Sequence, residues 1–276
     1  MTSENLSKGP AFRLQSPWLS ASLGFLLLIA LVLTWIPSFD EAANDYVNEA
    51  IVDAGIAHAL ARGINAVISV VQSIEISVSL GAGFAVNLGE ALDPLNDLIE
   101  RFSAFMFYAL AALGIKKLVL VASSSVIAKA IVSLAMISAF IIWITRGSLP
   151  TFLKGLLILL IMARFAFVVE VGISWSLDKL YFNAQQQEAV STLDLAKNKL
   201  KSVEQEYLSQ IEDSGVFRGA WSTAKTLVSA DDQQGITALS IDAVIQLLVI
   251  FLVKSTLLPL AFVWLMYAVF RRVINT

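Results

Sequence analysis

The sequence predicts an all-α protein of the polytopic membrane class: a helical bundle with four transmembrane helices, or alternatively five, and two helical segments outside the membrane. Two observations support this prediction. Hydrophobic residues make up 57% of the 276 residues and charged residues only 15%, whereas a soluble domain of this size carries more charge. The apolar residues also gather in runs of about 20 or more, the length that a helix needs to cross a bilayer.

The first long apolar run, residues 18–36, is expected to be an uncleaved transmembrane helix. Basic residues precede it, and its ends carry Trp18 and Trp35, a residue type that is enriched at membrane interfaces. A signal peptide has a shorter apolar core followed by a small-residue cleavage site, and this pattern is not found here. We therefore expect residues 1–17 to form a cytoplasmic tail.

Residues 37–101 form an acidic stretch that we expect to lie outside the membrane, in the periplasm, as a helical region. It holds ten acidic residues against two basic ones, and basic residues concentrate on the cytoplasmic side of membrane proteins. Within it, alanines recur at helical spacings of four and three, at Ala50, Ala54, Ala57 and Ala61. Small residues in such a stripe let another backbone approach closely. The partner of the stripe is either a neighbouring helix of the same chain or, as an oligomer seam, a second subunit.

The second half of the chain contains three further expected spans, residues 126–145, 150–175 and 239–270. The turn between the first two is short, so they should form an antiparallel pair. A second acidic stretch, residues 176–238, has helical periodicity interrupted near residue 214 and predicts an extramembrane helical hairpin. Residues 271–276 follow the last span and are expected to be a cytoplasmic C-terminus.

Residues 102–122 allow two topologies, because this apolar segment contains Lys116 and Lys117 side by side. If it crosses the membrane, five spans result and the two lysines lie at the cytoplasmic surface. Four basic residues then fall on the opposite side, against the positive-inside tendency. If the segment is re-entrant or buried against other helices, four spans result, both termini are cytoplasmic and both acidic stretches lie outside. The charge distribution favours the second arrangement.

Several charged residues fall within or beside the expected spans, and a charge at mid-membrane normally faces protein or water and is a functional candidate. The acidic one is Glu170, which we expect to be an intramembrane charge partner of Arg164 or Lys254. One carboxylate cannot neutralise all the basic groups, so the excess indicates an interior that attracts anions or binds anionic lipid headgroups. The candidate pore or anion- and lipid-binding residues are Lys116, Lys117, Lys129, Arg164 and Lys254.

The leading functional hypothesis is a homo-oligomeric channel or pore-like protein of the cell inner membrane. The alternative is a non-enzymatic scaffold or assembly subunit of an envelope complex that binds anionic lipid and an envelope protein. The chain has no cysteine and a single histidine, His58, which excludes thiolate and multi-histidine metal sites. No catalytic or nucleic-acid-binding motif is present. We therefore expect no enzyme activity, no cofactor, no metal and no nucleic-acid partner.

Overall fold

The computed structural model describes residues 17–82, 88–146, 149–214 and 236–274, and within these ranges every regular element is a helix. The predicted all-α class is confirmed. In the described part of the chain, five helices are long and apolar enough to cross a membrane, as expected of a multi-pass membrane protein. They cover Pro37–Val70, Asp93–Ser124, Val126–Arg146, Thr151–Ser202 and Ser240–Arg272.

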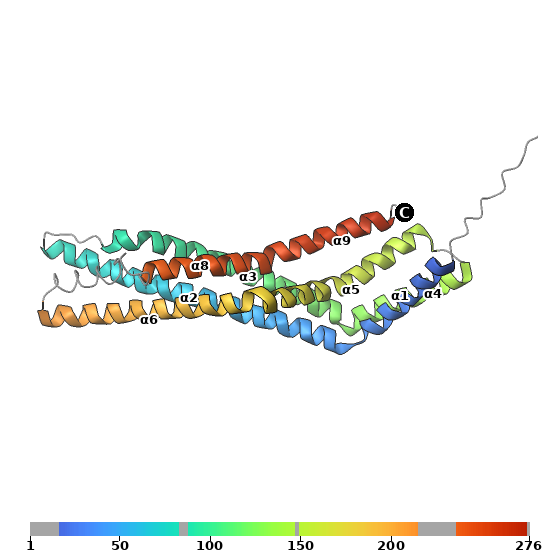
Figure 1. Cartoon of the computed structure of the whole chain (residues 1–276), viewed down its shortest axis with the longest axis horizontal. Coiled ribbons are helices and arrows are strands. Elements are labelled where there is room, and N and C mark those ends of the chain that lie inside the picture. The colour runs from blue at the N-terminus through green and yellow to red at the C-terminus, as the bar shows by residue number, and fades with distance from the viewer. Residues whose placement is uncertain (1–16, 83–87, 147–148, 215–235, 275–276) are drawn as a thin grey trace, which may run out of the picture.

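The described chain runs along one elongated rod in four successive passes (Figure 1). The first pass consists of α1 (Pro17–Thr34) and α2 (Pro37–Ala82). The second consists of α3 (Leu88–Ser124) and α4 (Val126–Arg146). The third is a continuous series of α5 (Thr151–Leu177), the π-helical turn η1 (Asp178–Phe182) and α6 (Asn183–Ser214). The fourth comprises α8 (Ile236–Leu252), the π-helical turn η2 (Val253–Leu257) and α9 (Leu258–Ile274).

One end of the rod carries the beginning of α1, the end of α4, the beginning of α5 and the end of α9 (Figure 1). The basic residues Arg146, Lys154, Arg271 and Arg272 therefore belong to this end. The positive-inside tendency makes it the cytoplasmic end if the rod crosses a membrane. We call the part built by α1, α4, α5 and α9 the terminal half, and the part built by α2, α3, α6 and α8 the distal half.

The segment 102–122 does not form a re-entrant turn, and this alternative of the sequence analysis is corrected. It lies within the single 37-residue helix α3, and α4 continues in the same direction beyond Ser125 (Figure 1). Lys116 and Lys117 thus lie within a helix rather than in a loop between two antiparallel spans. The other alternative was burial of the segment against other helices. Lys116 is buried in this way, with an exposed fraction of 6%.

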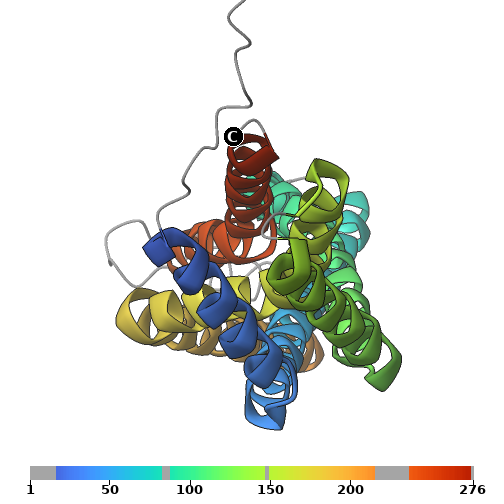
Figure 2. The same ribbon diagram turned by 90° about the vertical axis from the view of Figure 1, so that its right-hand side faces the viewer.

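The helices of the distal half pack as a square. Helix α2 packs on α3 and α6, while α8 packs on the same two helices from the opposite corner. The α2–α6 side and the α3–α8 side are therefore opposite faces of this half. In the terminal half, α1 packs on α4, α4 on α5 and α5 on α9, which gives a more open row of helices, seen from the end in Figure 2.

The alanine stripe lies inside this square, so the expected oligomer seam is corrected to an internal contact. Ala50, Ala54, Ala57 and Ala61 are all buried, and they belong to one apolar core with residues of α3, α6 and α8. Small side chains on α2 allow the facing helices to approach closely, which is the physical reason for the stripe. A second subunit cannot reach these alanines while the four-helix square is intact.

The expected hairpin over residues 176–238 is described only in its first arm. Residues 178–214 continue α5 through η1 into α6 without a turn. The second expected arm falls largely on residues 215–235, which lie outside the described ranges.

Because α6 packs into the square, alanine substitutions of two neighbouring leucines should change the free energy of unfolding by different amounts. Leu193 is 0% exposed within the core and Leu195 is 61% exposed on the same helix. We expect Leu193→Ala to lower the free energy of unfolding by about 2 to 5 kcal/mol, because it leaves a cavity. The matched Leu195→Ala should change it by less than about 0.5 kcal/mol. Unfolding by SDS in mixed micelles measures both, and equal effects would contradict this helix packing.

Candidate functional site

All four passes are interrupted where the terminal half meets the distal half. In the first pass α1 ends at Thr34 and α2 begins at Pro37, where proline is favoured because the first helical N–H needs no partner. The third and fourth passes each contain a π-helical turn, η1 and η2. Such turns inside α-helices are often found at functional sites. The buried charges of the protein lie around these interruptions.

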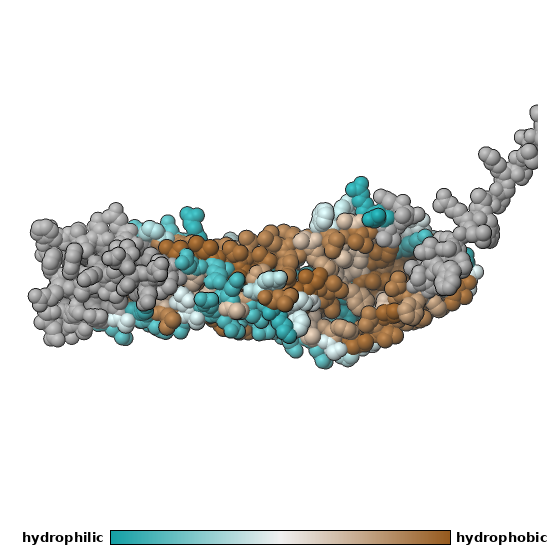
Figure 3. All heavy atoms as spheres, viewed as in Figure 1, coloured by the Kyte–Doolittle hydropathy of each residue, from teal (hydrophilic) through white to brown (hydrophobic). Residues whose placement is uncertain are grey.

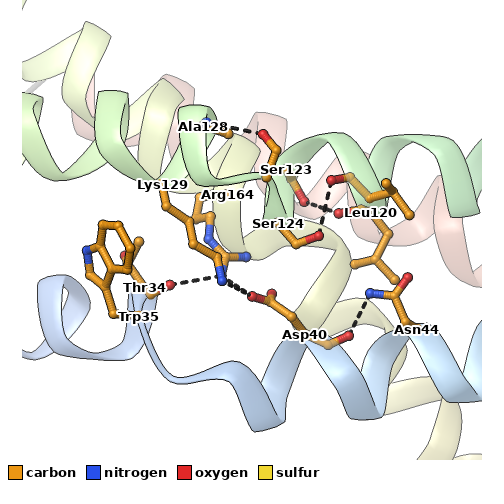
Figure 4. A network of polar contacts seen from close by, with 12 residues as sticks. Thr34, Trp35, Asp40, Asn44, Leu120, Ser123, Ser124, Ala128, Lys129 and Arg164 are labelled. Atoms are coloured by element: carbon orange, nitrogen blue, oxygen red, sulfur yellow. Dashed lines mark hydrogen bonds and ion pairs between the residues drawn. The ribbon is translucent and has the colours of Figure 1, made fainter.

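The second pass is interrupted by three consecutive serines. The hydroxyls of Ser123, Ser124 and Ser125 donate to the carbonyls of Leu120, Val121 and Ala122 at 2.9, 3.1 and 2.8 Å. Ser125 Oγ also accepts the N–H of Ala128 at 3.2 Å, and so caps the start of α4 (Figure 4). The serines therefore end one helix and start the next.

The first charged group joins the α1–α2 junction to α4 and α5 (Figure 4). Asp40 Oδ2 accepts from Arg164 Nη2 at 2.8 Å and pairs with Lys129 Nζ at 2.7 Å. Arg164 is only 2% exposed, and the same Nη2 donates to the carbonyl of Thr34 at 3.2 Å. Two basic groups therefore share one carboxylate, and together the three side chains carry a net charge of +1.

The second group lies about one and a half turns further along α5. Glu170 Oε2 pairs with Lys116 Nζ of α3 at 2.5 Å, and Ser174 donates to Glu170 Oε1 at 2.9 Å. All three side chains are buried. Glu170 is thus a charge partner, as expected, but its partner is Lys116 rather than Arg164 or Lys254.

The third group joins the two π-helical turns. Asp178, the first residue of η1, pairs with Lys254 of η2 at 2.8 Å and accepts the hydroxyl of Tyr46 at 2.6 Å. Lys254 also donates to Gln186 Oε1 at 3.1 Å, and Gln186 Nε2 donates to Asp53 at 2.7 Å. This group therefore connects α2, α6 and both π-helical turns.

The three groups form one polar column along α5 and η1. Arg164, Glu170, Ser174 and Asp178 are the buried polar residues of these two elements, and 14 residues of helix correspond to about 21 Å. Ser174 also lies beside Tyr46, which links the second group to the third. We call the side chains of the three groups the polar column.

The column changes the charge balance that the sequence suggested. Its four basic groups form ion pairs with three carboxylates, because Asp40 and Asp178 join Glu170, and Asp53 adds a fourth carboxylate through Gln186. Asp40 and Asp178 belong to the acidic stretches that were expected outside the membrane, so the positive excess predicted from the sequence was too large. A local signal for Asp178 was present, because Glu170, Ser174 and Asp178 are spaced four residues apart and share one helix face.

Lys116 and Lys117 have different environments although they are adjacent in the sequence. Lys116 is buried in its pair with Glu170. Lys117 is half-buried, and its Nζ lies 3.5 Å from the carbonyl of Asn44, which is a weak contact at that distance. Of the five predicted pore or lipid-binding residues, the column therefore contains Lys116, Lys129, Arg164 and Lys254 but not Lys117.

Comparison with known proteins gave no match to a family model, to a curated protein or to a solved structure. Among the residues that the structure describes, no group of three or more His, Cys, Asp or Glu side chains could hold a metal ion.

Removing one partner of a buried ion pair leaves the other charge uncompensated. We therefore expect Lys116→Met to lower the free energy of unfolding by about 3 to 5 kcal/mol. The matched variant Lys117→Met should lower it by less than about 1 kcal/mol, because Lys117 is half-buried and weakly bound. Adding Glu170→Gln to Lys116→Met should recover part of the loss. SDS unfolding measures all three variants, and a larger loss for Lys117→Met would contradict the assigned partners.

Proposed function

We propose that this protein is a non-enzymatic assembly subunit of the cell inner membrane that self-associates through one face of its distal half. The observation that carries the proposal is the contrast between two opposite faces at the same level of the rod. One of these faces is apolar and exposed, and the other is mainly hydrophilic. Both termini are cytoplasmic in this proposal, with the distal half on the other side of the membrane.

The apolar face lies on α3 and α8. The exposed large apolar side chains of these two helices include Phe107, Ile115 and Leu118 on α3 together with Ile245 and Val249 on α8. Figure 3 shows hydrophobic residues continuing from the terminal half along α8, whereas hydrophilic residues occupy the neighbouring surface over α2 and α6. Large apolar patches on a protein surface commonly mark interaction sites.

Neither water nor lipid alone satisfies both faces at this level. A bilayer surrounds a membrane protein on every side at a given depth, so a lipid environment would leave the charged α2–α6 face unsolvated. Water on every side would leave the apolar α3–α8 face exposed. A second copy placed face to face by a two-fold axis covers the apolar strip of each subunit and leaves both hydrophilic faces in water.

A channel is the second candidate, and it is supported by the first charged group of the polar column. Lys129 and Arg164 share Asp40, and Arg164 Nε and Nη1 have no hydrogen-bond partner among the described residues. A site with this excess positive charge suits an anion in transit or an anionic lipid headgroup. The other two basic groups of the column, Lys116 and Lys254, are each paired inside the subunit, so we place the assembly function first.

Self-association is testable by disulfide cross-linking, since the chain has no native cysteine. We expect oxidation of Phe107→Cys, Ile115→Cys or Ile245→Cys in membranes to produce covalent dimers, because these positions carry exposed apolar side chains on α3 and α8. The matched control Lys199→Cys is exposed on α6, on the opposite side, and should stay monomeric.

Light scattering of the purified protein in mild detergent measures the molecular mass of the assembly independently of cross-linking. A monomeric mass, together with no dimer from any of the three apolar positions, would refute self-association through this face. Dimers from Lys199→Cys alone would place the contact on α2 and α6 instead.

A further inference from the structure

A groove of about 410 Å³ lies between α2 and α6, on the face opposite the proposed contact between copies. Clefts of this volume accommodate small organic molecules. The groove is lined by carboxylates and amides, among them Glu49, Asp53, Asp194 and Gln187, and by the apolar side chains of Ile56, Leu60 and Val190. The groove therefore combines negatively charged side chains with an aliphatic wall.

A smaller pocket of about 60 Å³ adjoins the groove at the polar column. Glu49, Asp53 and Asn183 line both spaces. The inner pocket is also lined by Asp178, whose side chain is 94% buried. Its Oδ2 pairs with Lys254, while its Oδ1 has no hydrogen-bond partner among the described residues. A buried carboxylate oxygen without a donor is costly, so a ligand that supplies donors at this point would be stabilised.

The charges of the two spaces favour a cation. The inner pocket has three carboxylates, Glu49, Asp53 and Asp178, against the single ammonium of Lys254. Asp194 adds a fourth carboxylate in the groove. With no metal-binding cluster in the described residues, the arrangement suits a cation that brings its own hydrogen-bond donors.

The spacing of the carboxylates indicates the form of this cation. Gln186 holds Asp53 in place through a 2.7 Å hydrogen bond, and Asp194 lies eight residues further along α6. Eight residues of helix rise about 12 Å, which is close to the span between the terminal nitrogens of an extended triamine. Ile56, Leu60 and Val190 line the groove together with these charges and would contact the methylenes of such a chain.

We propose that the groove between α2 and α6 binds a linear aliphatic polyamine, with one terminal ammonium in the inner pocket beside Asp178 and Asp53. The other end of the polyamine lies beside Asp194, and its methylenes pack on the aliphatic wall. The ammonium is about the size of a water molecule, and a 60 Å³ space has room for it. No bond is formed or broken in this binding.

Isothermal titration calorimetry of the full chain in non-ionic detergent tests the site, with spermidine as the probe. We expect one spermidine per chain, and no comparable binding of Mg²⁺ at the same concentration. Asp53→Asn and Asp194→Asn should each weaken binding about tenfold, since each removes a charge-assisted hydrogen bond. Asp194 is exposed, so its variant keeps the test valid if Asp53→Asn folds poorly.

The matched control is Asp45→Asn, which removes the same charge from an exposed position of α2 that lines neither space. It should change the affinity by less than about twofold, because exposed charges act weakly at a distance. Absence of spermidine binding would overturn the proposal. Equal weakening by Asp45→Asn and Asp194→Asn, or equal binding of Mg²⁺, would also overturn it by showing non-specific attraction to an acidic surface.

Discussion

The polar column along α5 and η1 is the constraint on which the rest of the structure depends. A buried charge without a partner costs several kcal/mol, so each buried basic group limits which helix can lie beside α5 and at what height. Lys116 ties α3 to Glu170, Lys254 ties η2 to Asp178, and Asp40 ties α2 to Arg164. We infer that these pairs fix the register of the four passes, because apolar faces alone tolerate sliding of one helix along another.

The column also lies where the two halves of the rod meet. The breaks in the first two passes and the π-helical turns in the other two all occur in this middle region. Each π-helical turn contributes one member of the pair between Asp178 and Lys254. The irregular helix geometry and the buried charges therefore belong together, and both coincide with the change from the open row of the terminal half to the four-helix square.

The two proposals use opposite faces of the distal half and can operate in the same molecule. The α3–α8 face offers apolar side chains to a second copy, while the α2–α6 face keeps its groove open to solvent. The inner end of that groove reaches Asp178 and Lys254 of the polar column. A bound cation would thus contact Asp178, whose pair with Lys254 holds the third and fourth passes together. Ligand binding is in this way linked to the register of the helices.

The sequence by itself determined the all-α class, the close packing of the alanine stripe on α2, and the basic groups that need partners. These features are local, since helical periodicity and apolar content are set by residues a few positions apart. Only the tertiary structure decided that the alanines pack within the subunit, that Lys116 pairs with Glu170, and that Asp40 and Asp178 are buried. The acidic stretches around those two aspartates indicated exposure to water. Partners separated by more than 50 residues produce no periodic pattern in the sequence that would reveal their pairing. The pairings follow from which helix faces meet across the bundle, and that is settled by the packing of the whole chain.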